Sequence, residues 1–189
     1  MKDVLQAASE LQRFCQARSW RFCFIGGIAV QRWGEPRFTH DADLTLLTGF
    51  GEEEAFIDAL LAQYEARSPG ERDAALSNRV VRVEASNHVP LDIALGALPF
   101  EERTVGRASA WATNQPEEKL ITCSAEDLVV HKAFAGRVRD WLDLEGVLKR
   151  HGRRLNIEQI WEELTPLVAL KEEPEILTKL QGIFDKHLD

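Results

Sequence analysis

Cysteine is scarce in this sequence, and the few that occur do not form a recognisable site. The 189 residues include only three, Cys15, Cys23 and Cys123. Their number is odd, none stands in a CxxC spacing, and two fall within apolar helix or strand patterns. These features argue against a disulfide framework, so we expect the three thiols to be reduced and mostly buried.

Long apolar runs and an excess of basic residues are also missing. No window approaches eighteen uninterrupted apolar residues, and polar residues interrupt the first apolar stretch too early for a signal peptide. We therefore expect a cytoplasmic protein without a membrane segment. The 23 basic residues are outnumbered by 31 acidic ones, which gives a formal charge of -8. Such a balance excludes tight non-specific DNA binding, although a local basic cleft for RNA or a nucleotide is compatible with it.

Length and composition allow one core with a helical annex, because 189 residues with 44% hydrophobic content can hardly support two independent domains. Apolar periodicity predicts helices over 3–17, 52–64, 140–150, 157–164 and 176–188, with another from Ser124 to Gly136. Strands are predicted over 21–25 and 39–47, followed by a hairpin of 79–85 and 89–95. In the less regular stretch that follows, residues 103–110 are assigned to an edge strand and 114–118 to a turn.

The stretch from 22 to 47 contains the strongest pattern in the chain. A short apolar strand runs into Gly26-Gly27, a helical segment follows, and Asp41 and Asp43 lie in the next strand. Strand side chains alternate between faces, so the two aspartates point to the same side, roughly 6.5 to 7 Å apart at the backbone. Two buried like charges need a cation between them, and Mg²⁺ is the natural choice.

A third aspartate, Asp92, stands between Leu91 and Ile93 in the second strand of the hairpin. Together with Asp41 and Asp43 it would supply the carboxylates of a two-metal site, in which Mg²⁺ or Mn²⁺ ions clamp the attacking and leaving oxygens of a phosphoryl or nucleotidyl transfer. A simpler alternative places Asp41 and Asp43 on a solvent-facing strand and lets Asp92 cap the hairpin or pair with an arginine.

The order and spacing of these parts are more specific than each part alone. A G-[GS] turn, a strand with two acids and a distal strand with one Asp, together spanning 22–95, resemble the DNA polymerase β-like nucleotidyltransferase superfamily. The finer resemblance is to AbiEii-like nucleotidyltransferases, which include toxins of type IV toxin-antitoxin systems. It rests on Gly26-Gly27, Arg37-x-Thr39-x-Asp41-x-Asp43, Glu126-Asp127-Leu128, Lys132, Arg137 and Asp140-x-x-Asp143, and these motifs cover about two thirds of the chain.

The resemblance implies an α+β (mixed α/β) fold: a small mixed sheet packed by helices in 1–122, with a helical region, 123–189, closing the nucleotide cleft. It implies transfer of a nucleoside monophosphate from an NTP to an acceptor hydroxyl. Asp41, Asp43 and Asp92 would bind metal and act in catalysis with Lys132. Nucleotide binding is expected at Gly26, Gly27, Arg37, Thr39, Arg137, Asp140 and Asp143. Alternatively, the charged residues of the last motif form a solvated helix face.

The acceptor and the activity itself leave alternatives open. The resemblance to toxins favours RNA, tRNA ends in particular, or a protein target, with a separate antitoxin as neutralising partner. A small acceptor such as an aminoglycoside is the rival, and the acidic balance favours it. Many relatives have Ser or Thr where this chain has Ile28, which suggests a third possibility, a nucleotide-binding protein without turnover. A DxD glycosyltransferase does not fit, because only forty residues precede the motif.

Overall fold

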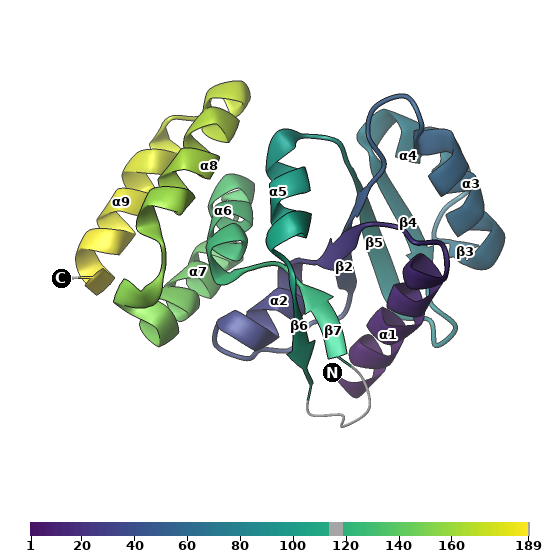
Figure 1. Ribbon diagram of the computed structural model, residues 1–189, viewed down its shortest axis with the longest axis horizontal. Helices are drawn as coiled ribbons and strands as arrows, with labels where there is room; N and C mark the ends of the chain where they lie inside the picture. The colour runs from purple at the N-terminus through teal and green to yellow at the C-terminus, as the bar shows by residue number, and fades with distance from the viewer. Residues whose placement is uncertain (114–118, 189) are drawn as a thin grey trace. The chain divides into compact units, whose positions relative to one another are not determined.

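The computed structural model describes residues 1–113 and 119–188, and the chain divides into two units. The first contains Met1–Ile28 and Phe38–Cys123, and the second contains Ala29–Arg37 and Ser124–Asp189. The boundary falls inside helix α2 (Gly26–Trp33), so the glycine turn and the rest of that helix are assigned to different units. Every strand of the described chain belongs to the first unit, and the second is helical (Figure 1).

The first unit is built on a seven-stranded mixed sheet with the order β3-β4-β5-β2-β1-β7-β6. Its strands are β1 (Phe22–Phe24), β2 (Ala42–Leu47), β3 (Glu65–Ala66), β4 (Val80–Glu84), β5 (Pro90–Gly96), β6 (Ser109–Ala112) and β7 (Lys119–Thr122). The pairs β2–β5 and β1–β7 are parallel and the others are antiparallel. The mixed α/β fold and the β4–β5 hairpin expected from the sequence are confirmed.

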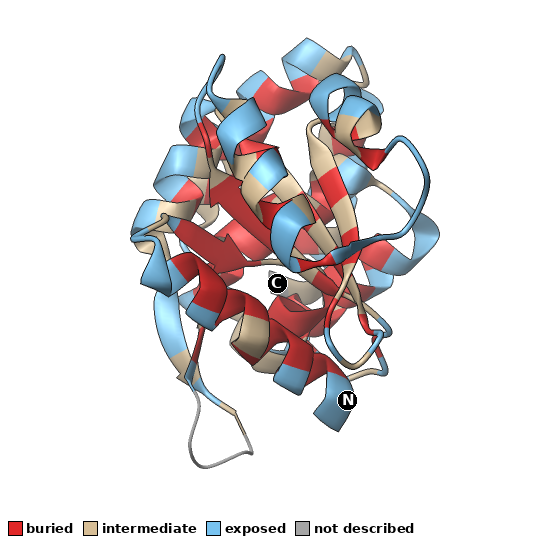
Figure 2. Ribbon diagram, turned by 90° about the vertical axis from the view of Figure 1, so that its right-hand side faces the viewer, coloured by how far each residue is buried: buried red, intermediate tan, exposed pale blue. Residues whose placement is uncertain are grey.

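One face of this sheet packs against three helices to form the core of the first unit. These helices are α1 (Lys2–Ala17), α3 (Glu53–Gln63) and α4 (Glu71–Asn78). Alternate residues of β2, namely Ala42, Leu44 and Leu46, are fully buried in this core with apolar residues of the helices. Figure 2 shows the same division, with buried residues along the strands and on the inner sides of the helices. Asp43, between Ala42 and Leu44, therefore faces the opposite side of the sheet.

That opposite side carries helix α5 (Pro99–Arg107) near the ends of β2 and β5. A Cβ on Gly96 would lie 3.1 Å from the Thr45 side chain and 3.3 Å from Cβ of Glu101, so the strand and helix are in close contact. Residues Asp43 and Asp92, near the starts of the same two strands, stay half-buried. This leaves one end of the face partly open for a site.

The second unit consists of the C-terminal helices and the segment Ala29–Arg37. The helices are α6 (Ala125–Ala135), α7 (Val138–His151), the 3-10 turn η1 (Gly152–Arg154), α8 (Ile157–Lys171) and α9 (Glu175–Leu188). The Ser124 side chain accepts a hydrogen bond from the Asp127 N–H at 3.0 Å, and Gly136 ends α6 with φ of +68°. The helical C-terminal region predicted from Ser124 onward is therefore observed.

Two predictions about secondary structure were wrong. Residues 103–110, assigned to an edge strand, instead lie mostly in α5, with β6 starting at Ser109. Pro99 at the first turn and the Glu101 carboxylate, which accepts from the N–H groups of Ala97 and Leu98 at 2.8 Å each, start that helix. The strand predicted from residue 39 begins only at Ala42.

Three further expectations from the sequence concern the burial of the cysteines, membrane-spanning helices and the turn at 114–118. The three cysteines are buried, as predicted. None of the helices within 1–113 and 119–188 is both long and apolar enough to cross a membrane. The turn predicted at 114–118 lies outside the described residues.

Candidate active site

Two glycines allow the turn after β1 to approach β2 closely. Gly26 has φ of +53°, and a Cβ there would lie 1.9 Å from Oδ2 of Asp43. A Cβ on Gly27 would lie 2.3 Å from Oγ1 of Thr39. Neither position can hold a larger residue without moving the polar side chains beside it, so the turn and the aspartate segment form one packed structure.

Replacing Gly26 with Ala is expected to lower the free energy of unfolding by roughly 2 to 4 kcal/mol, because the new methyl group would combine a left-handed backbone with a clash against Asp43. Chemical denaturation measures the change. Gly106→Ala, in α5, is the matched control, because a Cβ there meets nothing within 4 Å. Equal stabilities for the two variants would contradict the packing described above.

Hydrogen bonds hold the first two aspartates against this turn. The backbone oxygen of Asp43 accepts from the Ile25 N–H at 3.0 Å, and its Oδ2 lies 3.4 Å from the Gly27 nitrogen at the start of α2. Asp41 precedes the strand, and its Oδ1 accepts from the buried hydroxyl of Thr39 at 2.9 Å. The positive end of a helix favours a nearby carboxylate, so the turn supports the charge of Asp43.

Ile28 follows the glycine turn, where the family resemblance suggested a hydroxyl residue. Its side chain is fully buried in the apolar core of the first unit. The residue therefore contributes packing. Phosphate binding at this turn would depend on the backbone N–H groups of Gly26 and Gly27, as anion binding at helix starts commonly does.

Asp92 lies directly beside Asp43. The two residues are register partners in the parallel pair β2–β5, and Arg82 of β4 comes next in the same row. Adjacent strands are roughly 4.8 Å apart, so carboxylates on one face can reach a shared cation. Asp92 also forms an ion pair with Arg67 at 2.7 Å, in agreement with the alternative that it pairs with an arginine. The side chains of Asp92 and Arg67 are 31% and 36% exposed, so their ion pair contributes little stability. Another cation can therefore replace Arg67 beside Asp92.

The donor atoms in this row suit a magnesium ion. Carboxylate oxygens are hard ligands, and Mg²⁺ usually takes one or two of them and fills its shell with water and substrate phosphates. In the described part of the chain, no three His, Cys, Asp or Glu side chains come close enough together to hold a metal ion by themselves. Asp43 and Asp92 therefore fit a site that the phosphates complete, while Asp41 is held aside by Thr39.

The second unit contains a buried cluster of four charged residues. Lys132 Nζ of α6 lies 2.7 Å from Asp140 Oδ1 and 2.8 Å from Asp143 Oδ2 of α7. Arg37 donates to both oxygens of Asp143, at 2.6 and 2.8 Å. The side chains of Lys132 and the two aspartates are only 5 to 9% exposed, so the idea that these residues form a solvated helix face is wrong.

Two positive and two negative groups make this cluster electrically balanced. Burial alone would raise the pKa of Asp143, but the hydrogen bonds and charges of Arg37 and Lys132 outweigh it and lower that pKa. Asp140 Oδ2 is buried without a hydrogen-bond partner in the described chain.

The segment that carries Arg37 is fixed to α7 by close packing within the second unit. A Cβ on Gly146 would lie 3.1 Å from the Glu35 nitrogen, and Arg150 donates to the Gly34 oxygen. The Gln31 side chain donates to the Arg37 oxygen. Thr39 was predicted at the start of the strand over 39–47, but Thr39 and Arg37 both lie before the observed strand. Arg37 instead belongs with Asp143, 106 residues later in the chain.

The predicted site residues thus fall into two groups. Gly26, Gly27, Thr39, Asp41, Asp43 and Asp92 belong to the first unit, and Arg37, Lys132, Arg137, Asp140 and Asp143 belong to the second. Arg137 has an exposed side chain at the start of α7, where its backbone oxygen accepts from the Asp140 N–H at 3.0 Å. Sequence reasoning missed Arg67 and Arg82, because neither lies in a recognised motif.

Comparison with protein families gives an extensive match. The family described as "Nucleotidyl transferase AbiEii toxin, Type IV TA system" matches residues 11–188. A search of curated proteins found no match.

Two solved structures share the fold at low sequence identity. An antigenic nucleotidyltransferase-like protein from Paracoccidioides brasiliensis is 14% identical, with a TM-score of 0.55 over 95% of this chain and 93% of that one. ANT(2″)-Ia, in complex with adenylyl-2″-tobramycin, is 12% identical, with a TM-score of 0.54 over 90% of this chain and 99% of that one.

Proposed function

The chain belongs to the AbiEii nucleotidyl transferase family, and from this premise we propose that it transfers a nucleoside monophosphate from an NTP to an acceptor hydroxyl with Mg²⁺. The observation that carries the proposal is the row formed by Asp43 and Asp92 beside the Gly26-Gly27 turn. It combines carboxylates for a hard cation with backbone donors for phosphate.

The residues of the first unit divide the work of the reaction. Gly26 and Gly27 bind phosphate oxygens through the backbone N–H groups at the start of α2, where the Gly27 N–H also faces Asp43 Oδ2 at 3.4 Å. Asp43 and Asp92 hold the metal, with Asp41 as the third carboxylate once it leaves Thr39. Bound Mg²⁺ supplies positive charge that stabilises the transferred phosphoryl group and the leaving pyrophosphate. Asp92, about a third exposed, would take the proton of the acceptor hydroxyl.

The residues of the second unit act on the nucleotide. Arg37 keeps 23% of its side chain exposed while Asp143 fixes the plane of its guanidinium, so it can donate to a triphosphate oxygen at little entropic cost. Asp140, whose second oxygen is buried, contributes to nucleotide binding by holding Lys132 at 2.7 Å. Lys132 holds Asp140 and Asp143 in place. Arg137 lies at the surface, where its positive charge attracts the triphosphate over a longer range.

We further propose that the acceptor is RNA, with tRNA ends as the first choice, and that a separate antitoxin neutralises the protein. The family description, which names a toxin of a type IV toxin-antitoxin system, supports the antitoxin. The choice of RNA rests on the resemblance to such toxins. A small aminocyclitol-type acceptor is the second candidate. The net charge of -8 favours it, because cationic substrates are drawn to acidic proteins, and ANT(2″)-Ia shares the fold.

A labelling experiment tests these proposals. The protein is incubated with a fractionated lysate, Mg²⁺ and each NTP in turn, labelled at the α-phosphate. Label is expected in RNA, none is expected from γ-labelled NTP, and a chelator should abolish transfer. Label in small molecules, or in an added aminoglycoside, would favour the second candidate. Binding of NTP without labelling of any fraction would show that the protein lacks turnover.

A further inference from the structure

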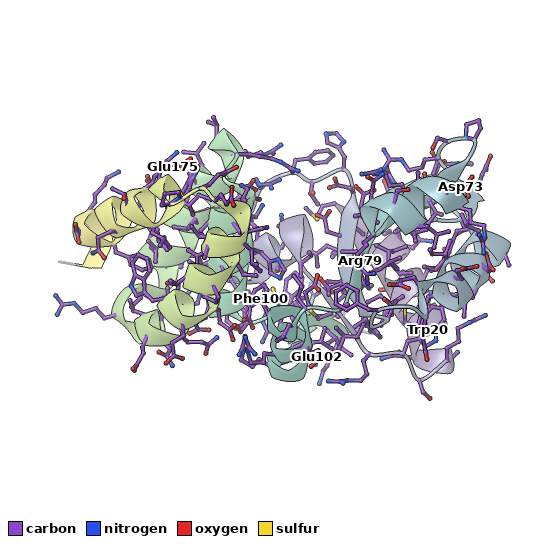
Figure 3. The ribbon with its side chains drawn as sticks, turned by 90° about the horizontal axis from the view of Figure 1, so that it is seen from above. Trp20, Asp73, Arg79, Phe100, Glu102 and Glu175 are labelled. Atoms are coloured by element: carbon purple, nitrogen blue, oxygen red, sulfur yellow. The ribbon has the colours of Figure 1, made fainter. Side chains whose placement is uncertain are left out.

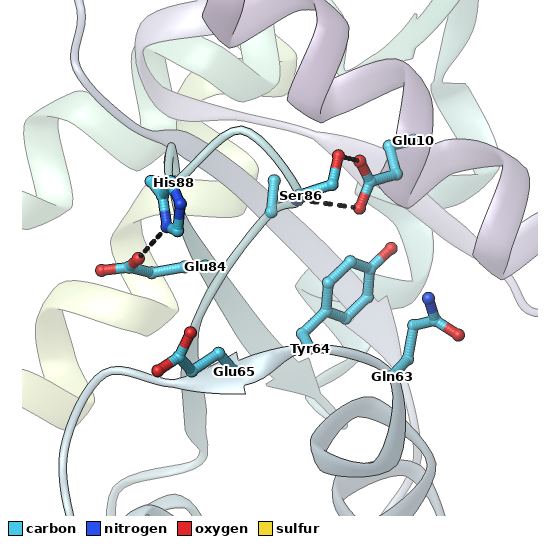
Figure 4. A pocket seen from close by; sticks show the side chains of 8 residues that line it. Glu10, Gln63, Tyr64, Glu65, Glu84, Ser86 and His88 are labelled. Carbon is cyan, nitrogen blue, oxygen red and sulfur yellow. Dashed lines mark hydrogen bonds and ion pairs between the residues drawn. The ribbon is translucent and has the colours of Figure 1, made fainter.

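An open cavity of about 210 Å³ lies at the β3 edge of the sheet, in the first unit. It is lined by Glu10, Gln63, Tyr64, Glu65, Glu84, Ala85, Ser86 and His88 (Figure 4). These residues come from α1, the end of α3, β3, β4 and the turn after β4. None of them belongs to the candidate active site, so the cavity calls for a separate explanation.

The lining of this cavity is strongly acidic. Three of its residues are glutamates, and in the described chain no lysine or arginine lines it. Glu65 and Glu84 are also direct register partners in the antiparallel pair β3–β4. Like charges at such positions repel each other, so the pair stabilises the sheet only when a positive group lies nearby. The cavity is therefore suited to a positively charged ligand.

Tyr64 provides a second, independent indication of a ligand. The residue is only 5% exposed, and its hydroxyl has no hydrogen-bond partner in the described chain. Burial, with the nearby charge of Glu10, raises the pKa of Tyr64 despite the opposing charges of Arg18 and Arg13, so the hydroxyl stays protonated. Figure 4 shows its ring reaching between Glu10 and Gln63. A buried hydroxyl normally has a hydrogen-bond partner, and a ligand in the cavity can supply the one that the described chain lacks.

The cavity is partly pre-organised for such a ligand. Glu10 accepts hydrogen bonds from the backbone N–H of Ser86, at 3.3 Å, and from its hydroxyl. Glu84 lies 3.3 Å from Nδ1 of His88. These contacts hold two carboxylates in place around the cavity while leaving Glu65 at its open edge.

We propose that this cavity binds a linear aliphatic polyamine. Carboxylates accept hydrogen bonds but cannot donate them, so the ligand must supply N–H donors and positive charge. A bare metal ion fits less well, because no three acidic or histidine side chains in the described residues come close enough together to hold one without ligands from a substrate. Ammonium groups separated by methylenes match spread carboxylates, and the methylenes can lie against the Tyr64 ring and Ala85.

Calorimetric titration with spermidine tests the proposal at low salt and about pH 8. Saturable one-site binding is expected, and 1,4-diaminobutane should bind more weakly. Glu65→Gln with Glu84→Gln should weaken spermidine binding roughly tenfold or more, because charge-assisted hydrogen bonds are lost. Glu102→Gln, on the exposed side of α5, is the control with the same kind of charge change and should bind as the parent does.

The Tyr64→Phe variant distinguishes binding of spermidine in the cavity from its non-specific attraction to an acidic protein. It should weaken spermidine binding several-fold without lowering the melting temperature, because the ring keeps its packing against Phe14 and no hydrogen bond within the chain is lost. The proposal is overturned if Glu102→Gln weakens binding as much as the double variant, or if MgCl₂ at equal charge displaces spermidine completely. It is also overturned if a lysine-containing peptide binds and spermidine does not, since a protein partner would then be the ligand.

Discussion

An Asp43→Asn protein should fold normally and transfer nucleotide at least about a hundredfold more slowly than the parent, because the substitution removes a charge needed to hold the cation but keeps the shape of the side chain. The amide can retain an oxygen acceptor towards the Gly27 N–H at 3.4 Å. The rate is measured with α-labelled NTP and the acceptor fraction identified by labelling. The Mg²⁺ concentration that gives half-maximal transfer, measured by titration, should rise.

The control for this experiment is Asp73→Asn. Asp73 lies at the surface on α4 (Figure 3) and loses the same charge in the same unit. Its transfer rate should equal that of the parent. If Asp43→Asn also transfers nucleotide at the parental rate with an unchanged melting temperature, the carboxylate row is not the metal site, and the proposed mechanism fails.

The elements that could be predicted from sequence are those with local causes. Alternation along 42–47 gives the face on which Asp43 lies, and the hairpin follows from two apolar runs with a short turn. Ser124 and Gly136 mark both ends of α6 through their own backbone chemistry. Each of these features depends on residues within a few positions of one another, so a single sequence is sufficient.

The pairing of Asp43 with Asp92 could be anticipated only in part. The sequence places both on strands, but their neighbouring positions come from the parallel register of β2 and β5, which the intervening chain does not encode locally. The Arg67 pairing is similar, because β3 is only two residues long and has no readable alternation. Such features depend on tertiary packing.

The second unit gives a clearer example of what periodicity cannot decide. Asp140 and Asp143 have the i, i+3 spacing typical of both exposed and buried helix faces. Their burial depends on Lys132 and on Arg37, which lie 8 and 106 residues away. Only the motif resemblance suggested that these four residues act together, and the contacts observed between them now give a physical reason for the spacing.

Lys132→Met should be the most destabilising substitution in this cluster, lowering the free energy of unfolding by roughly 3 to 5 kcal/mol, because it leaves two buried carboxylates with one positive partner. Urea denaturation measures the loss. Lys149→Met, at an exposed position of α7, should change stability by less than about 0.5 kcal/mol. Adding Asp140→Asn to Lys132→Met should restore part of the lost stability, because one uncompensated buried charge is removed.

The same cluster predicts an acid response with a definite sign. Because the folded protein holds the pKa of Asp143 below its ordinary value of 3.8, this residue stabilises the fold above that value and loses its contribution as pH falls through the lower, folded pKa. An Asp143→Asn protein should start less stable at neutral pH and show a shallower decline below about pH 4, where this carboxyl of the parent takes up a proton in the unfolded state before it does so in the folded state. Parallel stability curves for the two proteins would mean that Arg37 and Lys132 do not favour the charged form of Asp143, and the balanced cluster would need another explanation.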